Sequence, residues 1–164
     1  MAGPPALSLA NTWALKRGRL RDLLTDPVDL ERWLEREGLP DRGELAEFRA
    51  LRAAITRAFT ALSRGKQPPA ATIAQINQAS CREPVAPQLD WAGGEPQVEL
   101  AGTDPLAAVA RSAITLLAGP DRHRLRECQA PDCPLFFLTG NPRRRWCSTA
   151  CGTRVRVTRH LARG

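Results

Sequence analysis

The 164-residue chain contains no tyrosine, one methionine, two histidines and only two lysines among its 24 basic residues. It also lacks a phosphate loop, a nucleophile elbow and the glycine motif of dinucleotide-binding folds, so we do not expect an enzyme. No apolar run approaches the length of a membrane span. The first five residues lack a charged segment followed by an apolar core, so we expect no secretion signal and a cytoplasmic location.

Four of the five cysteines form two close pairs, Cys128 with Cys133 and Cys147 with Cys151. Four residues lie inside the first pair, three inside the second, and thirteen between the pairs. This spacing is typical of a structural site in which four thiolates hold one Zn²⁺ ion and leave no open coordination position for catalysis. Two disulfides, free thiols, or another metal such as an iron–sulfur cluster are the alternatives.

The residues around these pairs predict a treble-clef-like finger over residues 121–164. The apolar residues 135–138 predict a strand, with Phe136 and Phe137 shared between core and surface. Residues 139–142 predict a turn, and residues 143–146 predict the returning strand of a hairpin. Cys147 and Cys151 are four residues apart, so a helix beginning near Ser148 would place both thiols on one face.

The charge is concentrated in this C-terminal part. Residues 121–164 carry ten arginines and three acids, a net charge of +7, whereas residues 1–120 carry fourteen basic and fourteen acidic side chains. A compact module with a basic face is the expected footprint of a protein that binds a phosphate backbone, although a solubilising surface has the same composition. The candidate contacts lie on the expected hairpin and helix: Arg143, Arg144, Arg145, Arg154, Arg156, Arg159 and Arg163.

Residues 1–120 predict a mainly α-helical domain with one small β-hairpin. Apolar residues spaced by three and four predict helices over residues 7–15, 27–37, 41–63, 70–79 and 104–117, with the arginines of the longest helix off its apolar stripe. Apolar and polar residues alternate on both sides of Gly93-Gly94, which predicts a hairpin near residues 88–100.

A few residues stand outside these patterns. We expect Asn11 to be a helix cap or a core amide with its hydrogen bonds satisfied, with a ligand contact as the alternative. Cys81 is expected to be a buried or half-buried thiol without a function, and Trp91 to pack on the helices. His123 is expected to be solvated, whereas His160 is either a plain surface residue or a phosphate contact.

The segment Trp146-Cys147-Ser148-Thr149-Ala150-Cys151-Gly152-Thr153-Arg154 resembles the signature of the CGNR zinc finger family of bacterial proteins. Residues 7–12, 22–24, 27–34 and 38–39 resemble the ABATE domain that precedes the finger in that family. Thr153 stands where the family has its name-giving asparagine, and the second cysteine pair is one residue narrower than in many relatives. Neither difference removes a metal ligand.

The resemblance implies a transcription regulator that binds nucleic acid, or an RNA-binding zinc-ribbon protein. We expect double-stranded DNA in preference to RNA, because the finger helix can lie in a major groove, where arginine reads guanine. The N-terminal domain would then sense a small-molecule effector or form a homodimer on paired half-sites. A zinc-stabilised adaptor that binds acidic proteins is the alternative.

Overall fold

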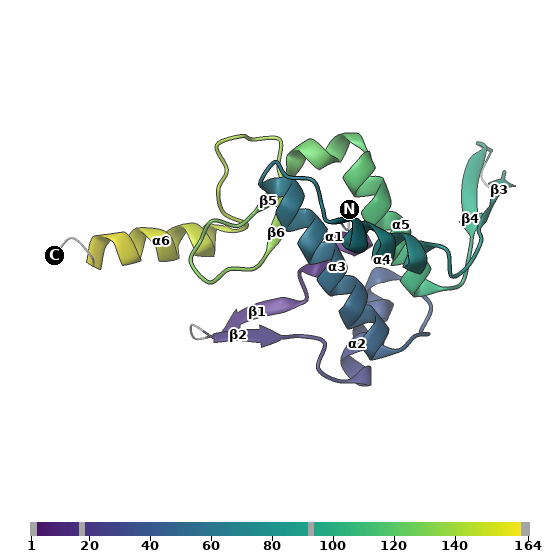
Figure 1. Cartoon of the computed structure of the whole chain (residues 1–164), viewed down its shortest axis with the longest axis horizontal. Helices are drawn as coiled ribbons and strands as arrows, with labels where there is room; N and C mark the ends of the chain where they lie inside the picture. The colour runs from purple at the N-terminus through teal and green to yellow at the C-terminus, as the bar shows by residue number, and fades with distance from the viewer. Residues whose placement is uncertain (1–2, 17–18, 92–93, 162–164) are drawn as a thin grey trace.

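The computed structural model describes residues 3–16, 19–91 and 94–161, with the backbone alone at residues 16 and 99–101. Within these ranges the chain is mainly helical, with three separate two-stranded antiparallel sheets. Figure 1 shows a helical body in the middle, from which α6 (Thr149–Leu161) projects at one end and the β3–β4 hairpin at the other. None of the helices in the described ranges is long and apolar enough to cross a membrane.

Five helices form the body: α1 (Pro5–Ala10), α2 (Pro27–Glu37), α3 (Leu45–Ser63), α4 (Ala70–Ser80) and α5 (Pro105–Ala118). The helix predicted over residues 27–37 is confirmed, with the Asp26 side chain accepting a hydrogen bond from the Asp29 amide at 2.9 Å. Gly38 ends it in the left-handed conformation, with φ of 67°. The Asp104 side chain caps α5 in the same way as Asp26 caps α2.

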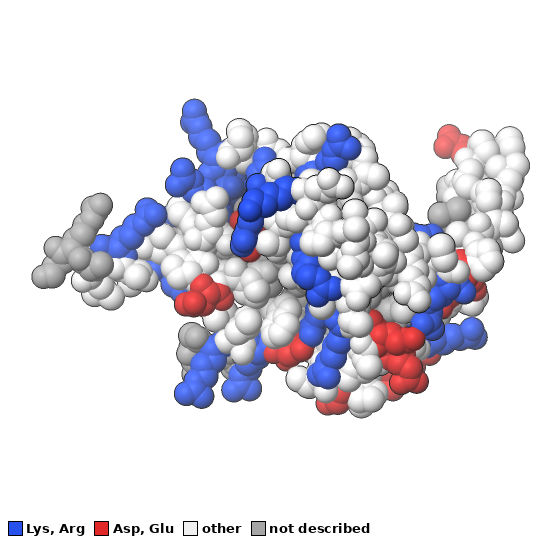
Figure 2. All heavy atoms as spheres, viewed as in Figure 1, with Lys and Arg blue, Asp and Glu red and all other residues white. Residues whose placement is uncertain are grey.

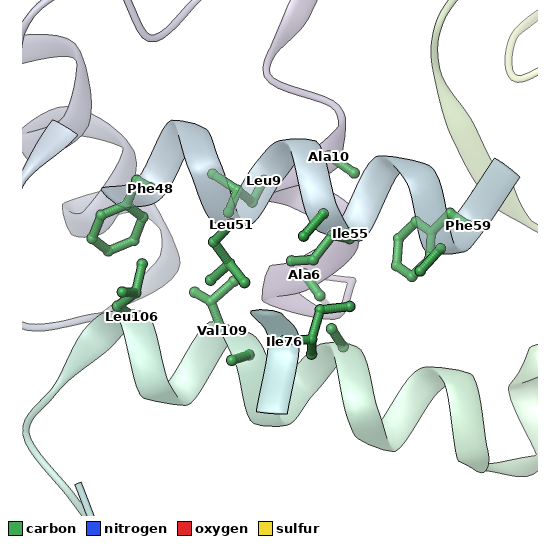
Figure 3. Packing of buried hydrophobic residues seen from close by; sticks show 14 of the residues in the cluster. Ala6, Leu9, Ala10, Phe48, Leu51, Ile55, Phe59, Ile76, Leu106 and Val109 are labelled. Atoms are coloured by element: carbon green, nitrogen blue, oxygen red, sulfur yellow. The ribbon is translucent and has the colours of Figure 1, made fainter. Parts of the chain in front are cut away.

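The core lies where α1, α3, α4 and α5 meet. Figure 3 shows Phe48, Leu51, Ile55 and Phe59 along one side of α3, facing Leu106 and Val109 of α5, while Ala6, Leu9 and Ala10 come from α1. Burying each large apolar side chain stabilises the fold by about 1.5–3 kcal/mol. The apolar stripe predicted for the longest helix is therefore a packed core face.

The first predicted helix is wrong beyond residue 10. After α1 ends, residues 13–16 form β1 (Trp13–Lys16), which pairs with β2 (Arg19–Asp22) in the register Trp13↔Asp22 and Leu15↔Leu20. Trp13, Leu15 and Leu20 alternate with polar or small residues, a period of two that suits a strand. The apolar composition of residues 7–15 is thus divided between a short helix and a hairpin.

Arg52 holds this hairpin to α3, although the residue lies off the apolar stripe of that helix. Its side chain is buried, and the two terminal nitrogens each donate to an Asp22 carboxylate oxygen at 2.5 Å. The guanidinium carbon also lies 4.6 Å from the centre of the Trp13 ring. Burial alone would raise the pKa of Asp22, but the hydrogen bond from Arg52 and its charge hold that pKa below the ordinary value.

The hairpin predicted near residues 88–100 is confirmed as β3 (Ala86–Asp90) and β4 (Gln97–Ala101), with Leu89 opposite Val98. The expected packing of Trp91 on the helices is wrong, because the hairpin projects from the body and leaves this ring 60 % exposed (Figure 1). Cys81 is exposed rather than buried, since it caps the C-terminal end of α4 at the surface.

The finger contains a 3₁₀ helix η1 (Pro120–Arg124), β5 (Leu125–Glu127), β6 (Phe136–Leu138) and α6. The predicted hairpin between residues 135–138 and 143–146 is wrong, because β6 pairs with β5 instead. Leu125 and Phe136 are both buried in the main core, whereas the three consecutive arginines of residues 143–145 are exposed. The apolar strand therefore pairs with the segment that shares its buried face.

Candidate metal centre and basic surface

The four clustered cysteines bring their sulfur atoms within 4.8 Å of one another. The Cys133–Cys147, Cys147–Cys151 and Cys133–Cys151 sulfur distances are 3.8, 3.6 and 3.8 Å. A tetrahedral ion with metal–sulfur bonds of about 2.3 Å has sulfur–sulfur edges of about 3.8 Å. None of the five cysteines forms a disulfide, so the disulfide alternative does not describe this structure. The four thiols can hold a tetrahedral metal ion.

Local backbone structure fixes the ligands. Cys128 follows β5 directly, and Cys133 follows a turn in which Asp132 has a φ of 59°. Cys147 precedes α6, and its amide lies 3.4 Å from the sulfur of Cys128. The Ser148 hydroxyl accepts a hydrogen bond from the Cys151 amide at 3.3 Å and so caps the first turn of α6. The helix begins where the sequence predicts, although only the second thiol of its pair lies within it.

Crowding and burial oppose ionisation of two of these thiols when no cation is present. Burial, together with neighbouring thiols, raises the pKa of Cys147 to about 11 and also raises the pKa of Cys133. Burial opposes ionisation of Cys151 as well, but hydrogen bonds with Ser148 and the other cysteines leave its pKa below the ordinary value. A divalent cation at the centre would overcome the opposition to ionisation at Cys133 and Cys147 and favour four thiolates.

Only a small apolar cluster surrounds the four cysteines. Its buried members are Cys128, Ala130, Phe137, Cys151 and Val155, with Trp146 packed against them. A methyl group added at Gly152 would lie 3.1 Å from the Trp146 ring, so the residue after the last ligand allows close packing there.

The neighbouring residues Phe136 and Phe137 face opposite sides of β6. The sequence predicts that the two rings are shared between core and surface, but both are buried: Phe137 in the apolar cluster around the cysteines and Phe136 in the core of the helical body. The Phe136 ring makes an edge contact with Phe59 of α3, with ring centres 5.6 Å apart. One strand of the finger therefore belongs to both apolar clusters.

Polar contacts hold the same strand to the body. The Asn11 side-chain nitrogen donates to the Phe136 carbonyl oxygen at 2.9 Å, and the Asn11 side-chain oxygen accepts from the Phe136 amide at 2.8 Å. Arg64 at the end of α3 makes two hydrogen bonds with Glu127 of β5, at 3.1 and 3.2 Å. Asn11 caps the C-terminal end of α1 and its side-chain amide is satisfied, as expected, although the residue is half-buried. Nothing local in the sequence identifies its partner 125 residues away.

Two of the candidate arginines are engaged inside the finger. Arg144 donates to the carbonyl oxygens of Trp146 at 3.0 Å and Cys147 at 2.5 Å, and its guanidinium lies 4.9 Å from the Phe137 ring centre. Arg154 donates to the Pro131 carbonyl oxygen at 2.8 Å. It also lies 4.0 Å from the Cys151 sulfur, and its Nε is buried without a partner among the described residues. Both side chains support the fold around the cysteines.

Other candidate arginines face solvent. The exposed ones are Arg143, Arg145, Arg156 and Arg159. Among these four, only the Arg156 side chain has a hydrogen-bond partner within the described residues, the Thr153 hydroxyl at 3.0 Å. Arg163 lies outside the described residues. Figure 2 shows many basic side chains over the finger end of the molecule and few acidic ones.

Both histidines lie on the surface. His123 is exposed and accepts a hydrogen bond from Arg122 at 3.1 Å, and His160 is exposed on α6. Neither is near enough to join the cysteine cluster, whose members are the four thiols alone among the described residues.

Comparison with known families agrees with the two resemblances in the sequence. The ABATE family model, described as "Putative stress-induced transcription regulator", matches residues 3–120, and the CGNR zinc finger model matches residues 124–164. A search of curated proteins found no match. The two models follow each other in the order that the sequence predicts. The chain therefore belongs to the ABATE family and carries a CGNR zinc finger behind its ABATE domain.

Proposed function

We propose that this protein is a DNA-binding transcription regulator whose finger is organised by Zn²⁺ and binds the phosphate backbone of duplex DNA. The observation that carries the proposal is a group of exposed arginines on the finger beside the cysteine cluster. Arg143, Arg145 and Arg159 have no internal partner among the described residues. Arginines that serve folding are engaged within the protein, as Arg144 and Arg154 are, so free ones are available to phosphates.

Zinc is the metal that best suits the cluster. Four soft thiol ligands at tetrahedral spacing favour a borderline-soft d¹⁰ ion over harder cations such as Mg²⁺ or Ca²⁺. Four thiolates and Zn²⁺ have a combined charge of −2, and Arg154 beside Cys151 offsets part of it. Cys128, Cys133, Cys147 and Cys151 would hold the ion and leave no position for a substrate, so we infer a structural role and no enzymatic activity.

The lack of exposed aromatic rings among the described residues of the finger favours duplex DNA over single-stranded RNA. Single-stranded bases bind by stacking on exposed aromatic rings. Phe136 and Phe137 are buried, and Trp146 packs against Gly152. A basic helix with exposed Arg156 and Arg159, by contrast, suits a groove lined by phosphates. The contact set that we propose is Arg143, Arg145, Arg156 and Arg159, with Arg163 added from the sequence.

The N-terminal domain would control this binding. We propose, as the sequence predicts, that its helices sense a small-molecule effector or join two copies into a homodimer on paired half-sites. A cytoplasmic protein associated with the nucleoid would follow from this role. Effector sensing and dimerisation have this role only if the protein binds DNA, so DNA binding is the first property to measure.

The test is a binding series with the zinc-loaded full chain. Fluorescently labelled duplex DNA, single-stranded RNA of matched length and polyglutamate are each titrated at several salt concentrations. The five proposed finger contacts alone predict a slope of log K against log salt of roughly −4 to −5 on duplex DNA. The variant Arg143→Ala/Arg145→Ala should reduce the magnitude of the slope by about 2, since each lost contact changes it by about 0.9.

A matched control removes the same charge elsewhere. Arg32→Ala/Arg36→Ala changes two exposed arginines of α2 and should leave the slope unchanged. Preference for RNA would redirect the proposal to an RNA-binding protein. Equal binding to polyglutamate would favour an adaptor for acidic partners, and absence of binding to every nucleic acid would overturn the proposed function.

A further inference from the structure

The β1–β2 hairpin carries the arginines of the N-terminal domain that have no internal partner. Arg19 and Arg21 are exposed, and neither has a hydrogen bond or ion pair within the described residues. Every other described arginine before residue 120 bonds to a protein group: Arg32, Arg36, Arg42, Arg49, Arg52, Arg57, Arg64, Arg82 and Arg111. The two exceptions are therefore not explained by folding.

The two faces of the hairpin differ. Register places Trp13 opposite Asp22 and Leu15 opposite Leu20 on one face, and the contacts of Arg52 with Trp13 and Asp22 fix this face to α3. Because side chains alternate along a strand, Arg19 and Arg21 lie on the other face. In sequence this short segment also contains Lys16 and Arg17 and, as its only acid, Asp22, whose charge is already paired with Arg52.

The hairpin lies at the finger end of the molecule. Figure 1 shows β1 and β2 extending along the long axis toward the same end as α6. Leu15 of β1 lines one hollow together with Cys133, Pro134 and Arg154 of the finger. Asn11, two residues before β1, holds the Phe136 backbone. The hairpin and the finger thus present adjacent surfaces.

We propose that the β1–β2 hairpin is a second nucleic-acid contact, in which Arg19 and Arg21 bind phosphates of the same duplex that the finger binds. The inference rests on the proposed function of the finger. It assigns to the N-terminal domain a direct part in DNA binding, beyond sensing or dimerisation. Phosphate contacts of this kind fix the register and orientation of a protein on the duplex, so the hairpin would set the direction in which the finger helix meets the DNA.

Strand pairing of the hairpin favours this role. A free arginine loop must lose conformational entropy when it binds, whereas Arg19 and Arg21 already lie in a paired strand whose base Arg52 holds through Trp13 and Asp22. The guanidinium groups keep their charge at any relevant pH and can each donate two hydrogen bonds to a phosphate. Exposed position, free charge and a strand-paired backbone occur together at this hairpin.

The experiment compares Arg19→Ala/Arg21→Ala with the wild-type chain and with the Arg32→Ala/Arg36→Ala control, all full-length and zinc-loaded. The hairpin variant should reduce the magnitude of the duplex salt slope by about 2 and weaken binding at 0.1 M salt by roughly tens of fold. The control variant has the same net charge as the hairpin variant, but it should bind DNA as the wild type does. Arg19→Lys/Arg21→Lys should restore most of the slope, because lysine retains the point charge.

The outcomes separate the two proposals. If the wild type binds DNA with a steep slope and the hairpin variant matches it, the hairpin inference is overturned and the finger function stands. If the wild type does not bind DNA at all, the proposed function fails and the inference fails with it. Circular dichroism and metal content are measured on each variant to check that folding is unchanged. A loss of DNA affinity in the α2 control as large as that in the hairpin variant would attribute the effect to net charge and also overturn the inference.

Discussion

At the residue scale, Asn11 makes the shortest polar link between the helical body and the finger. Its amide bonds both backbone groups of Phe136, much as a neighbouring strand would. Asn11→Ala should lower the free energy of unfolding by about 2–3 kcal/mol, because both groups lose their partners in a partly buried position. Urea unfolding of the two chains measures the difference. Asn77→Ala, an exposed change on α4, should cost almost nothing, and a similar loss in both variants would contradict this role.

The Asp22–Arg52 pair gives a pH-dependent contribution to stability. The pKa of Asp22 is lowered in the folded protein, so its stabilisation is complete above the unfolded pKa of about 3.9 and is lost as pH falls through the lower folded value. Asp22→Asn should therefore be less stable than wild type by about 1–3 kcal/mol at pH 7. The two unfolding curves should converge at strongly acidic pH. The exposed control Asp41→Asn should have nearly the same free energy of unfolding as the wild type at pH 7, which leaves no difference to disappear at acidic pH.

Arg154, the last residue of the family signature, should act on the metal through its neighbours. Arg154→Ala removes the bond to the Pro131 carbonyl and the guanidinium beside Cys151. Metal affinity should fall on the order of 10-fold, as is usual when a group that supports the ligands is lost. Competition with a chromophoric chelator measures it. Arg156→Ala, two residues further along α6, should keep the metal as tightly as wild type, and a loss as large as that of Arg154→Ala would argue against a specific role.

At the scale of elements, we expect α6 to depend on a bound metal ion more than any described helix of the body does. Only Cys151, Gly152 and Val155 of its thirteen residues are buried, and a helix of this length is marginal without tertiary support. Chelation should therefore reduce the helical signal by about the contribution of α6 and make residues 149–161 sensitive to trypsin. The helices of the body should remain protected, because their core contains none of the four ligands.

Two cysteine variants make this test specific. Cys133→Ser should behave like the chelated protein, whereas Cys81→Ser should retain one metal ion per chain, since Cys81 is exposed and outside the cluster. Loss of metal in both variants would show that the assignment of the cluster is wrong.

Elements with local signals could be predicted from the sequence, and those with distant partners could not. The caps at Asp26 and Asp104 and the spacing of apolar residues located α2 and α5. Trp13 reads as part of a helix until its contact with Arg52, far along the chain, is known. The pairing of β6 with β5 likewise depends on burial of Phe136 against Phe59. Cysteine spacing fixed the four thiols, but it carries no information on which arginines turn inward.

At the scale of the whole molecule, the two ends differ in character. The finger end carries the excess positive charge, and the opposite end carries the β3–β4 hairpin with exposed Leu89, Trp91 and Val98 (Figures 1 and 2). A field of one sign at one end steers an anionic partner toward that end at low salt. The association rate with duplex DNA should therefore fall more steeply with salt than the dissociation rate rises, which stopped-flow measurements can resolve.

The opposite orientations of Phe136 and Phe137 have a consequence for how this chain can be recombined. The family models meet between residues 120 and 124, yet the packing boundary runs through the middle of β6. A finger cut out at that sequence boundary would expose Phe136 and Leu125, and the helical domain left behind would open the apolar site that both residues fill. The finger is thus not structurally independent of the helical body. Recombination that joins it to an unrelated domain must also supply an apolar surface for β5 and β6.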